Sequence, residues 1–593
     1  MPRSRQDESH SSSDDRALRF PTNIVPWLRE GFGLIDVLVL IGLGVVIYLL
    51  VRSASSWTGP YQPKVSISLS PAALPAYAGL STLRMLLAYV LSIAFTLVYG
   101  SIAASRPVAE KFMIPILDIL QSVPILSFMP GVVLTLVAIF PGRDLGVELS
   151  SVVLIFTSMA WNLTFSFYHS LRSVPSELTE ASRLYRLTRW QRFTRRDLPA
   201  GVIGLVWNSM MSWAGGWFFL MAAETFTEGN RDFRLPGLGS YLQAAANAGD
   251  VGAILLGVLT LVVLIVVIDQ LLWRPLIAWS DRFRVEMTES SDLPRSWFLE
   301  LLQDSTLLRT IGRSMARTRE GIQDARLRRE RRPRPQPSPA VRRAGRRIAN
   351  VTVAVIALVA LAVGAAASLR LAVQVSPGEF LILVEDFFLT LSRVIVALIV
   401  GVLWTVPVGV AIGLNPRLAR ITQPIVQVVA SVPATAVFPI LVGLLLQLRG
   451  GLELAAVLLM LLGTQWYLLF NIIAGASSIP TELREAGRVF KLRRIHWWRT
   501  LVLPSLFPYL LTGLLTATGG AWNASIVSEY VSYRGRVSMI RGLGSAITYS
   551  AARGSYGELL VATLVMALGV ALINRLVWKR LFAISESRFR LGT

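Results

Sequence analysis

Long apolar runs recur along nearly the whole chain, and each is about long enough to cross a hydrocarbon layer roughly 30 Å thick. They lie near 34–51, 81–105, 114–139, 149–170, 200–225 and 253–275, and then near 348–370, 386–414, 421–447, 453–474, 506–530 and 558–580. The composition agrees, because 53% of the residues are hydrophobic and only 16% are charged. We therefore predict an all-α polytopic membrane protein with about 12 transmembrane helices.

The residue counts also exclude several functions. The chain has no Cys, which removes disulfide frameworks, thiolate metal sites and Cys nucleophiles. His10, His169 and His496 are far apart in sequence, so we expect no metal site. We find no nucleophile or acid–base cluster, and therefore predict that the chain is not an enzyme and carries no catalytic residue. The net charge of +22 would suggest nucleic acid binding in a soluble protein, but nothing around the charge resembles a nucleic-acid-binding fold.

Lys and Arg in the flanks of the apolar runs predict the orientation. With the N-terminus in the cytoplasm, the first half has 15 basic residues inside and 5 outside. The second half divides in the same sense, about 17 to 6. We expect a multi-pass protein of the bacterial inner membrane with both termini cytoplasmic, and interpret the first run as an uncleaved anchor because it lacks a small-residue cleavage site.

An internal duplication accounts for the two sets of runs. Residues 173–199 match residues 478–504 at an offset of 305, with 11 identities in 27 positions. The same offset relates Trp161 to Trp466, Gly215 to Gly520, Trp217 to Trp522 and Glu224 to Glu529. Further upstream, an offset of 309 relates Arg84 to Arg393. Six spans per copy is an even number, so the two copies are predicted to be parallel repeats with a pathway between them.

The duplication sets the expected domain boundaries. We predict a cytoplasmic tail at 1–33, a first permease-like domain at 34–280, a linker at 281–347, a second domain at 348–580 and a tail at 581–593. The linker is basic, with 14 Arg and 3 acidic residues in 309–347, and its prolines favour an extended spacer. Residues 297–322 are amphipathic, so the linker is either a solvated tether or a segment that binds anionic lipid.

The duplicated segment carries the clearest family signal. Glu180-Ala181-Ser182, with Leu198-Pro199 placed so that Pro199 lies 19 residues beyond the Glu, resembles the EAA loop of ABC importer permeases. Glu485-Ala486-Gly487 and Leu503-Pro504 repeat that pattern at the same spacing. The spacing from Trp217 or Trp522 to the following Glu, and the Gly-Leu-Gly after it, resembles the nitrate/sulfonate/bicarbonate (NitT/TauT) type of permease. The resemblance implies a type I importer fold, with two permease halves fused in one chain.

The resemblance further implies that each loop holds a coupling helix that docks into an ATP-binding subunit. The coupling residues would then be Glu180, Ala181, Ser182 and Pro199 in the first copy, and Glu485, Ala486, Gly487 and Pro504 in the second. The chain departs from the family where a Gly six residues after the Glu is replaced by Arg186 and by Lys491, and loss of Gly predicts that the helix continues through these positions. No G-x-x-x-x-G-K-[ST] motif occurs, so ATP and Mg are expected on two partner ATP-binding cassette subunits and no cofactor on this chain.

The kinked helices with Ser-x-Pro segments line the pathway in proteins of this family. By that resemblance the pathway candidates are Asp118, Gln121, Ser122, Gln427 and Ser431, and the prolines that follow predict a kink in each helix. Polar groups in apolar surroundings are functional candidates, and hydrogen bonding between helices is the other interpretation.

Glu224 and Glu529 complete the list of pathway candidates. They come about 25 residues after the Leu-Pro starts, so each either ends its helix in water or acts as a gate or substrate contact. Two carboxylates repel an anionic substrate unless they are protonated or paired with Arg. Beyond them, residues 530–557 contain four Arg and no acidic residue. This basic segment either attracts anions or an acidic docking surface, or only reflects an Arg-rich composition.

These observations favour the permease subunit of an ATP-driven importer for a small anionic solute. The alternative is an ATP-independent secondary transporter or channel with two parallel six-span halves. The sequence leaves open whether a periplasmic or lipid-anchored substrate-binding protein delivers the solute. Besides the ATP-binding subunits, the expected partner is the lipid bilayer.

Overall fold

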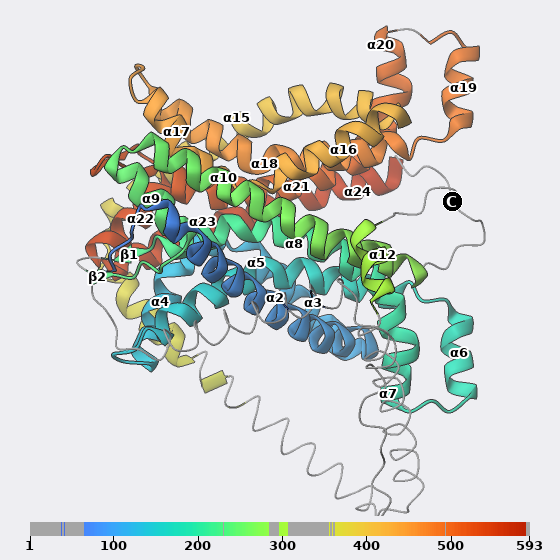
Figure 1. Ribbon diagram of the computed structural model, residues 1–593, viewed down its shortest axis with the longest axis horizontal. Helices are drawn as coiled ribbons and strands as arrows, with labels where there is room; N and C mark the ends of the chain where they lie inside the picture. Colours follow the sequence, from blue (N-terminus) through green and yellow to red (C-terminus); the bar gives the residue numbers. More distant parts are fainter. Residues whose placement is uncertain are drawn as a thin grey trace, which may run out of the picture. The chain divides into compact units, whose positions relative to one another are not determined.

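The computed structural model describes residues 37, 41, 65–228, 231–283, 296–305, 355, 358–359, 362–492 and 494–588, and Figure 1 shows the arrangement of its helices. The chain forms two compact units. The smaller unit, Met1–Val46 with Trp297–Gln336, contains helix α12 (Trp297–Asp304), which falls within the predicted amphipathic segment 297–322. The remainder of that segment and most of the linker lie outside the described residues. The larger unit, Ile47–Ser296 with Pro337–Thr593, contains both copies of the repeat.

The first copy is a series of helices closed on one side by a short hairpin. Its elements are η2 (Pro71–Ala73), α2 (Leu74–Ser105), α3 (Pro107–Ser122), η3 (Ile125–Phe128), α4 (Met129–Ile139), α5 (Leu145–Arg172), α6 (Ser176–Leu184), α7 (Arg189–Arg192), η4 (Phe193–Asp197), α8 (Leu198–Glu224), β1 (Thr227–Glu228), β2 (Arg231–Asp232), α9 (Leu238–Ala248), α10 (Val251–Ile268), η5 (Asp269–Trp273), α11 (Arg274–Ser280) and η6 (Asp281–Phe283).

The second copy repeats this order almost element for element. Its elements are α15 (Pro377–Gly413), α16 (Pro416–Ser431), α17 (Ala434–Leu445), α18 (Gly451–Ser477), α19 (Thr481–Val489), α20 (Arg494–Trp497), η7 (Trp498–Val502), α21 (Leu503–Ser528), β3 (Tyr530–Tyr533), β4 (Arg536–Met539), α22 (Leu543–Arg553), α23 (Tyr556–Ile573), η8 (Asn574–Trp578) and α24 (Lys579–Arg588). The two hairpins, β1–β2 and β3–β4, are both antiparallel. The predicted duplication is therefore confirmed by the structure as well as by the sequence.

The described residues include seven helices long and apolar enough to cross a membrane, or eight if one bent pair counts as a single span. They correspond to the runs expected near 81–105, 149–170, 253–275, 386–414, 453–474, 506–530 and 558–580, with 421–447 as the bent pair. The run near 200–225 forms the single helix α8, which is not among the seven. The run near 34–51 lies outside the described residues except for Val37 and Ile41, and that near 348–370 is described mainly at Ala362–Ala372.

The two runs with Ser-x-Pro segments are broken, as the prolines predicted. In the second copy α16 and α17 meet at an angle of 76°, with Val432 and Pro433 in extended conformation between them. In the first copy α3 ends at Ser122, and extended Val123 and Pro124 precede η3. Proline favours extended backbone at the residue before it and removes a hydrogen-bond donor, which favours a break in the helix at these two segments.

Packing is also duplicated. In the first copy α5 packs between α2 and α8, and in the second α18 packs between α15 and α21. Trp217 and Trp522 are buried at equivalent places in the two cores, where Trp522 stacks on Phe387 at 5.2 Å between ring centroids. The two copies also contact each other: α3 of the first copy packs against α23 of the second, and α16 and α17 of the second pack against α8 and α10 of the first.

Candidate functional site

The segment expected to hold a coupling helix forms a helical hairpin in each copy. In Figure 1, α6 with α7 and α19 with α20 project beyond the long helices at the same end of the larger unit. Glu180 and Glu485 are exposed, Ala181 and Ala486 are half-buried, and Ser182 and Gly487 are buried. Two loops 305 residues apart therefore present the same pattern of exposure, which argues that they have the same kind of neighbour.

The buried small residue explains how each hairpin closes. The Arg196 guanidinium donates to the Ser182 hydroxyl oxygen at 3.3 Å, so η4 lies against α6 at this point. In the second copy Leu501 occupies the position equivalent to Arg196, and a Cβ added to Gly487 would lie 3.3 Å from its side chain. A larger residue at either position would separate the two arms of the hairpin.

A left-handed residue ends each coupling-type helix, which contradicts the expectation that the helix continues. Arg186 has φ +48° and Lys491 has φ +49°. In the first copy the Arg186 amide donates to the Arg183 carbonyl and the Leu187 amide donates to the Ser182 carbonyl, which is the Schellman pattern of helix termination. The prediction from helix propensity was wrong because the turn, and not the helix, determines the conformation at this position.

Apolar side chains at equivalent positions project from both hairpins, and the sequence analysis missed them. Leu184 and Tyr185 are 81% and 77% exposed, and the equivalent Val489 and Phe490 are 78% and 76% exposed. Two further pairs of equivalent positions behave alike, in that Leu178 and Leu483, and Trp190 and Ile495, are all exposed. Conspicuous apolar groups on exposed helices indicate an interaction surface. The signal available in the sequence was the recurrence of large apolar residues within otherwise polar helices.

Each hairpin is joined to a long helix of the membrane region without a break. The residues on either side of the Asp197–Leu198 and Val502–Leu503 junctions have helical backbone angles, and Pro199 and Pro504 stand in the first turns of α8 and α21, where we expected them. A proline within a continuous helix leaves a carbonyl without its donor and crowds the preceding turn. The π-helical turns η4 and η7, directly before these prolines, accommodate that defect.

At the opposite end of α8, Glu224 is completely buried in a charge network. The Arg84 guanidinium donates to both oxygens of Glu148 at 2.6 and 2.8 Å and to Glu224 at 2.7 Å. Glu224 also accepts from the Ser81 hydroxyl at 2.7 Å and from the Gly239 amide at 2.8 Å. The network connects α2, α5, α8 and the N-terminal turn of α9, where a carboxylate is favoured by the helix dipole.

The second copy builds the same network around Glu529. Arg393 donates to Glu529 at 2.7 Å and to both oxygens of Glu453 at 2.6 and 2.9 Å. Thr390 and the Gly544 amide donate to Glu529 as Ser81 and Gly239 do to Glu224. The interpretation that these Glu residues end their helices in water is therefore wrong, because Arg84 and Arg393 pair with them. The sequence analysis missed Glu148 and Glu453, although they obey the offset of 305.

The network also gives a physical reason for the Gly-Leu-Gly motif. A Cβ added to Gly237 would collide with the Glu224 carboxylate, and one added to Gly542 would collide with Glu529. These glycines have extended backbone, so the requirement is space for the carboxylate and not an unusual conformation.

The remaining pathway candidates lie apart from these networks. Gln427 is half-buried and Ser431 is buried, and both line a cavity of about 20 Å³ beside α8 and α10 of the other copy. A cavity of that size holds about one water molecule. Asp118 and Gln121 are exposed, and an Asp118 oxygen lies 4.0 Å from the Lys579 ammonium of α24. The side chain of Ser122 lies outside the described residues.

The basic segment after α21 is partly neutralised. Arg541 pairs at 3.1 Å with both Glu385 and Asp386 of α15, and these hydrogen bonds raise the pKa of Arg541 above its usual value. Arg534 and Arg553 lie beside the rings of Tyr533 and Tyr549. Within the described residues no group of three His, Asp or Glu side chains is arranged to hold a metal ion.

These features define a helical membrane protein with two copies of a single transport-type unit. The chain belongs to the family described as "Binding-protein-dependent transport system inner membrane component", whose model matches residues 96–272 and again residues 401–590. The two matches confirm the predicted resemblance and place one family domain in each half.

Curated relatives are permeases of import systems. The nitrate import permease protein NrtB of Leptolyngbya laminosa is 30% identical over 188 residues, which are 32% of this chain and 64% of that protein. The taurine transport system permease protein TauC of Escherichia coli K12 is 29% identical over 31% of this chain and 61% of its own length. The bicarbonate transport system permease protein CmpB of Synechococcus elongatus is 26% identical over 32% and 65%, respectively. The chain thus spans less than two thirds of the length of each of these relatives.

Proposed function

We propose that this chain is the permease of an ATP-driven importer for a small anion, and that two separate ATP-binding cassette subunits drive it. The observation that carries the proposal is the pair of hairpins α6–α7 and α19–α20. They share their sequence pattern, their exposure and their continuity with a long helix of the membrane region. On the orientation predicted from the Lys and Arg distribution, both hairpins face the cytoplasm, where ATP is available.

Docking would bury the apolar side chains that the hairpins expose. Leu184 and Tyr185 on one loop, and Val489 and Phe490 on the other, would insert into an apolar cleft on an ATP-binding subunit. Burying a large apolar side chain contributes about 1.5–3 kcal/mol, so two per loop supply a substantial part of a stable contact. Among the described residues of this chain, none covers these four side chains, which remain more than three quarters exposed.

Charge would then orient each docked loop. Glu180 and Glu485 are exposed on α6 and α19, so each is placed to accept hydrogen bonds from a partner cation. Losing a charge partner at a desolvated interface costs about 2–5 kcal/mol. ATP and its Mg ion would be held by the partner, since this chain has no phosphate-binding loop.

The helical connection would transmit the motion of the partner. A displacement of α7 moves η4 and α8 with it, because the backbone is helical across both junctions. α8 contacts α16 and α17 of the other copy, and α16 holds both Gln427 and Ser431. In this account Asp118, Gln121 and Ser122, together with Gln427 and Ser431, line the pathway that opens between the copies.

Small anions are the proposed substrates, in agreement with the nitrate and bicarbonate systems named for two of the relatives, while the taurine system named for the third handles a zwitterion that carries an anionic sulfonate group. The buried Glu224 and Glu529 do not oppose an anion, because Arg84 and Arg393 compensate their charges. The family description implies a binding protein, so we propose that a periplasmic or lipid-anchored subunit delivers the solute to the face that carries β3–β4.

Co-expression with an ATP-binding subunit encoded beside this chain tests the proposal. We expect the wild-type chain to purify with two copies of that subunit. Glu180→Arg combined with Glu485→Arg should release them, while Arg282→Glu, an exposed charge reversal outside both hairpins, should retain them. Retention of the ATP-binding subunits by the double variant, with normal transport, would contradict the coupling assignment and favour the secondary transporter.

A further inference from the structure

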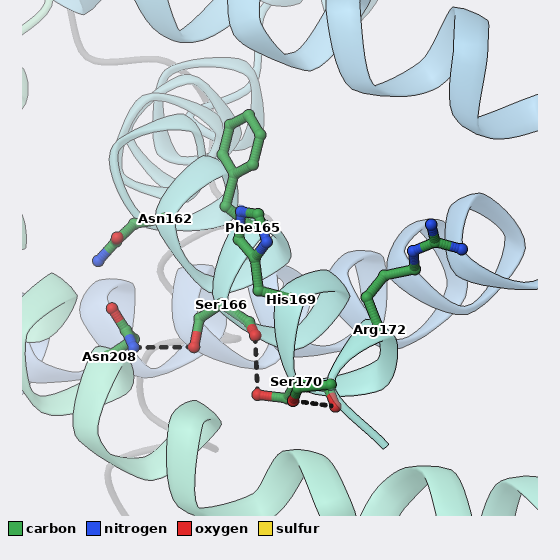
Figure 2. Close-up of a pocket in the computed structure, with 8 residues that line it drawn as sticks. Asn162, Phe165, Ser166, His169, Ser170, Arg172 and Asn208 are labelled. Carbon is green, nitrogen blue, oxygen red and sulfur yellow. Dashed lines mark hydrogen bonds between the residues drawn. The ribbon is translucent and has the colours of Figure 1, made fainter. Parts of the chain in front are cut away.

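A hollow of about 780 Å³ opens along α5 and α8 in the first copy. Figure 2 shows its lining, which comes from one face of α5 and from Asn208 on α8. On α5 the lining residues recur at helical spacing and end next to the hairpin: Asn162, Phe165, Ser166, His169, Ser170, Arg172 and Ser173. The hollow therefore extends from within the helical region to the base of α6.

The lining is rich in hydrogen-bond donors and contains no carboxylate. Asn208 donates to the Ser166 hydroxyl at 2.8 Å, and Asn162 donates to Ser212 at 3.0 Å, so both amides are fixed. The Arg172 guanidinium is 56% exposed and forms an ion pair at 3.7 Å with Glu110, which lies outside the lining. His169 stacks on Phe165 with its ring exposed toward the same side. Charged and neutral donors without a competing carboxylate in the lining favour an anion.

The second copy does not preserve this hollow. At the equivalent positions its side chains are mostly apolar or absent, and none is charged: Tyr467, Phe470, Asn471, Ala474, Gly475, Ser477, Ser478 and Gly513. The Tyr509 ring lies on Gly475, where an added Cβ would come within 2.7 Å of it. In the first copy this pair is Ser170 and Gly204, and a Cβ added to Gly204 would come within 2.8 Å of the Ser170 hydroxyl, so a small polar side chain stands where the second copy has a tyrosine ring.

A second tyrosine marks the same asymmetry nearer the contact between the copies. A Cβ added to Gly520 would lie 3.5 Å from the Tyr467 ring, and one added to Gly215 in the other copy would lie 3.4 Å from its hydroxyl. Tyr467 therefore lies between repeat-related glycines of α21 and α8. Its counterpart in the first copy is Asn162, the lining residue of α5 that is farthest along the helix from the hairpin.

We propose that the hollow binds the transported anion on its way to the cytoplasm, and that this site exists in the first copy alone. The inference rests on the proposed importer function and adds the exit site to it. The volume greatly exceeds that of a nitrate-sized ion, so the ion enters with water and contacts a few donors at a time. Loose binding of this kind suits release, because a tightly held solute would delay the cycle. In the second copy the equivalent space is filled by side chains. Because the two halves are encoded separately within one chain, each can change independently of the other.

Exchanging the packing between copies tests the site. Ser170→Gly combined with Gly204→Tyr would reproduce in the first copy the pair that Gly475 and Tyr509 already form in the second. In proteoliposomes containing the complex with its ATP-binding subunits, we expect ATP-driven uptake of nitrate, bicarbonate or taurine to fall at least tenfold. Co-purification of the ATP-binding subunits should be unchanged. Uptake within twofold of wild type would overturn the proposal.

A charge variant keeps the test valid if the exchanged packing prevents folding. Arg172→Gln should raise the apparent KM for the anion at least threefold at low salt, and less at high salt because exposed charges are screened. Arg282→Gln removes an exposed Arg outside the hollow and should leave KM unchanged. Equal KM values for the two variants would contradict the site. If the wild-type complex transports none of the three solutes, or does so without ATP, the importer function itself fails, so the two failures are distinguishable.

Discussion

Replacing Arg84 with Met should destabilise the chain more than any single change in the second network. Arg84 is 1% exposed and its side chain satisfies Glu148 and Glu224, whose side chains are 5% and 0% exposed. Without the guanidinium, two buried carboxylates would lack a counter-ion and three or more hydrogen bonds. Breaking a buried ion pair by removing one partner costs about 3–5 kcal/mol. If a copy of about 200 residues unfolds as one unit, that loss lowers the apparent melting temperature by about 6–20 °C.

Arg393→Met provides the matched comparison, because it removes the equivalent guanidinium. Its partner Glu453 is 52% exposed and can be hydrated when the Arg is lost, whereas Glu148 cannot. We therefore expect a clearly smaller shift for Arg393→Met, measured by fluorescence-detected size-exclusion chromatography after heating in detergent. Equal shifts for the two variants, or a shift below about 2 °C for Arg84→Met, would refute the argument from burial.

Three further outcomes follow from the same geometry. Arg186→Gly should stabilise the first hairpin by about 1 kcal/mol, because Gly adopts the left-handed conformation without the penalty of a Cβ, and the unfolding midpoint of the chain should rise slightly. Gly542→Ala should destabilise the chain by about 2 kcal/mol or more in the same thermal assay, since its Cβ collides with Glu529, while Gly519→Ala, which meets no neighbouring atom, should be tolerated. In this Cys-free chain, Ser66→Cys should react with an impermeant reagent from outside and Ser587→Cys should not, and the reverse labelling would invert the predicted orientation.

The sequence predicted the features that repeat or that depend on local chemistry. Two copies at a constant offset made the helical order and the paired loops visible, and the Ser-x-Pro segments indicated where α3 and α16 would break. Pro199 and Pro504 began their helices where first-turn prolines are expected.

Features that depend on tertiary contacts could not be predicted in this way. Glu224 has the sequence context of a helix end, and only the packing of α2 and α5 places Arg84 and Ser81 beside it. Arg186 occupies a left-handed turn because the hairpin must reverse there, and this requirement outweighs the intrinsic helix propensity of Arg. The hollow in the first copy arises from differences between the copies, which an analysis guided by their similarity overlooks.

ATP-dependent uptake by the reconstituted complex tests the central claim most directly. Proteoliposomes containing this chain, its ATP-binding subunits and the cognate binding protein should accumulate nitrate, bicarbonate or taurine only when ATP is supplied on the side of the two hairpins. Changing Leu184 and Tyr185 to Ser should abolish that uptake while the chain remains folded. Uptake that proceeds without ATP, driven by an ion gradient and unaffected by these changes, would contradict the account.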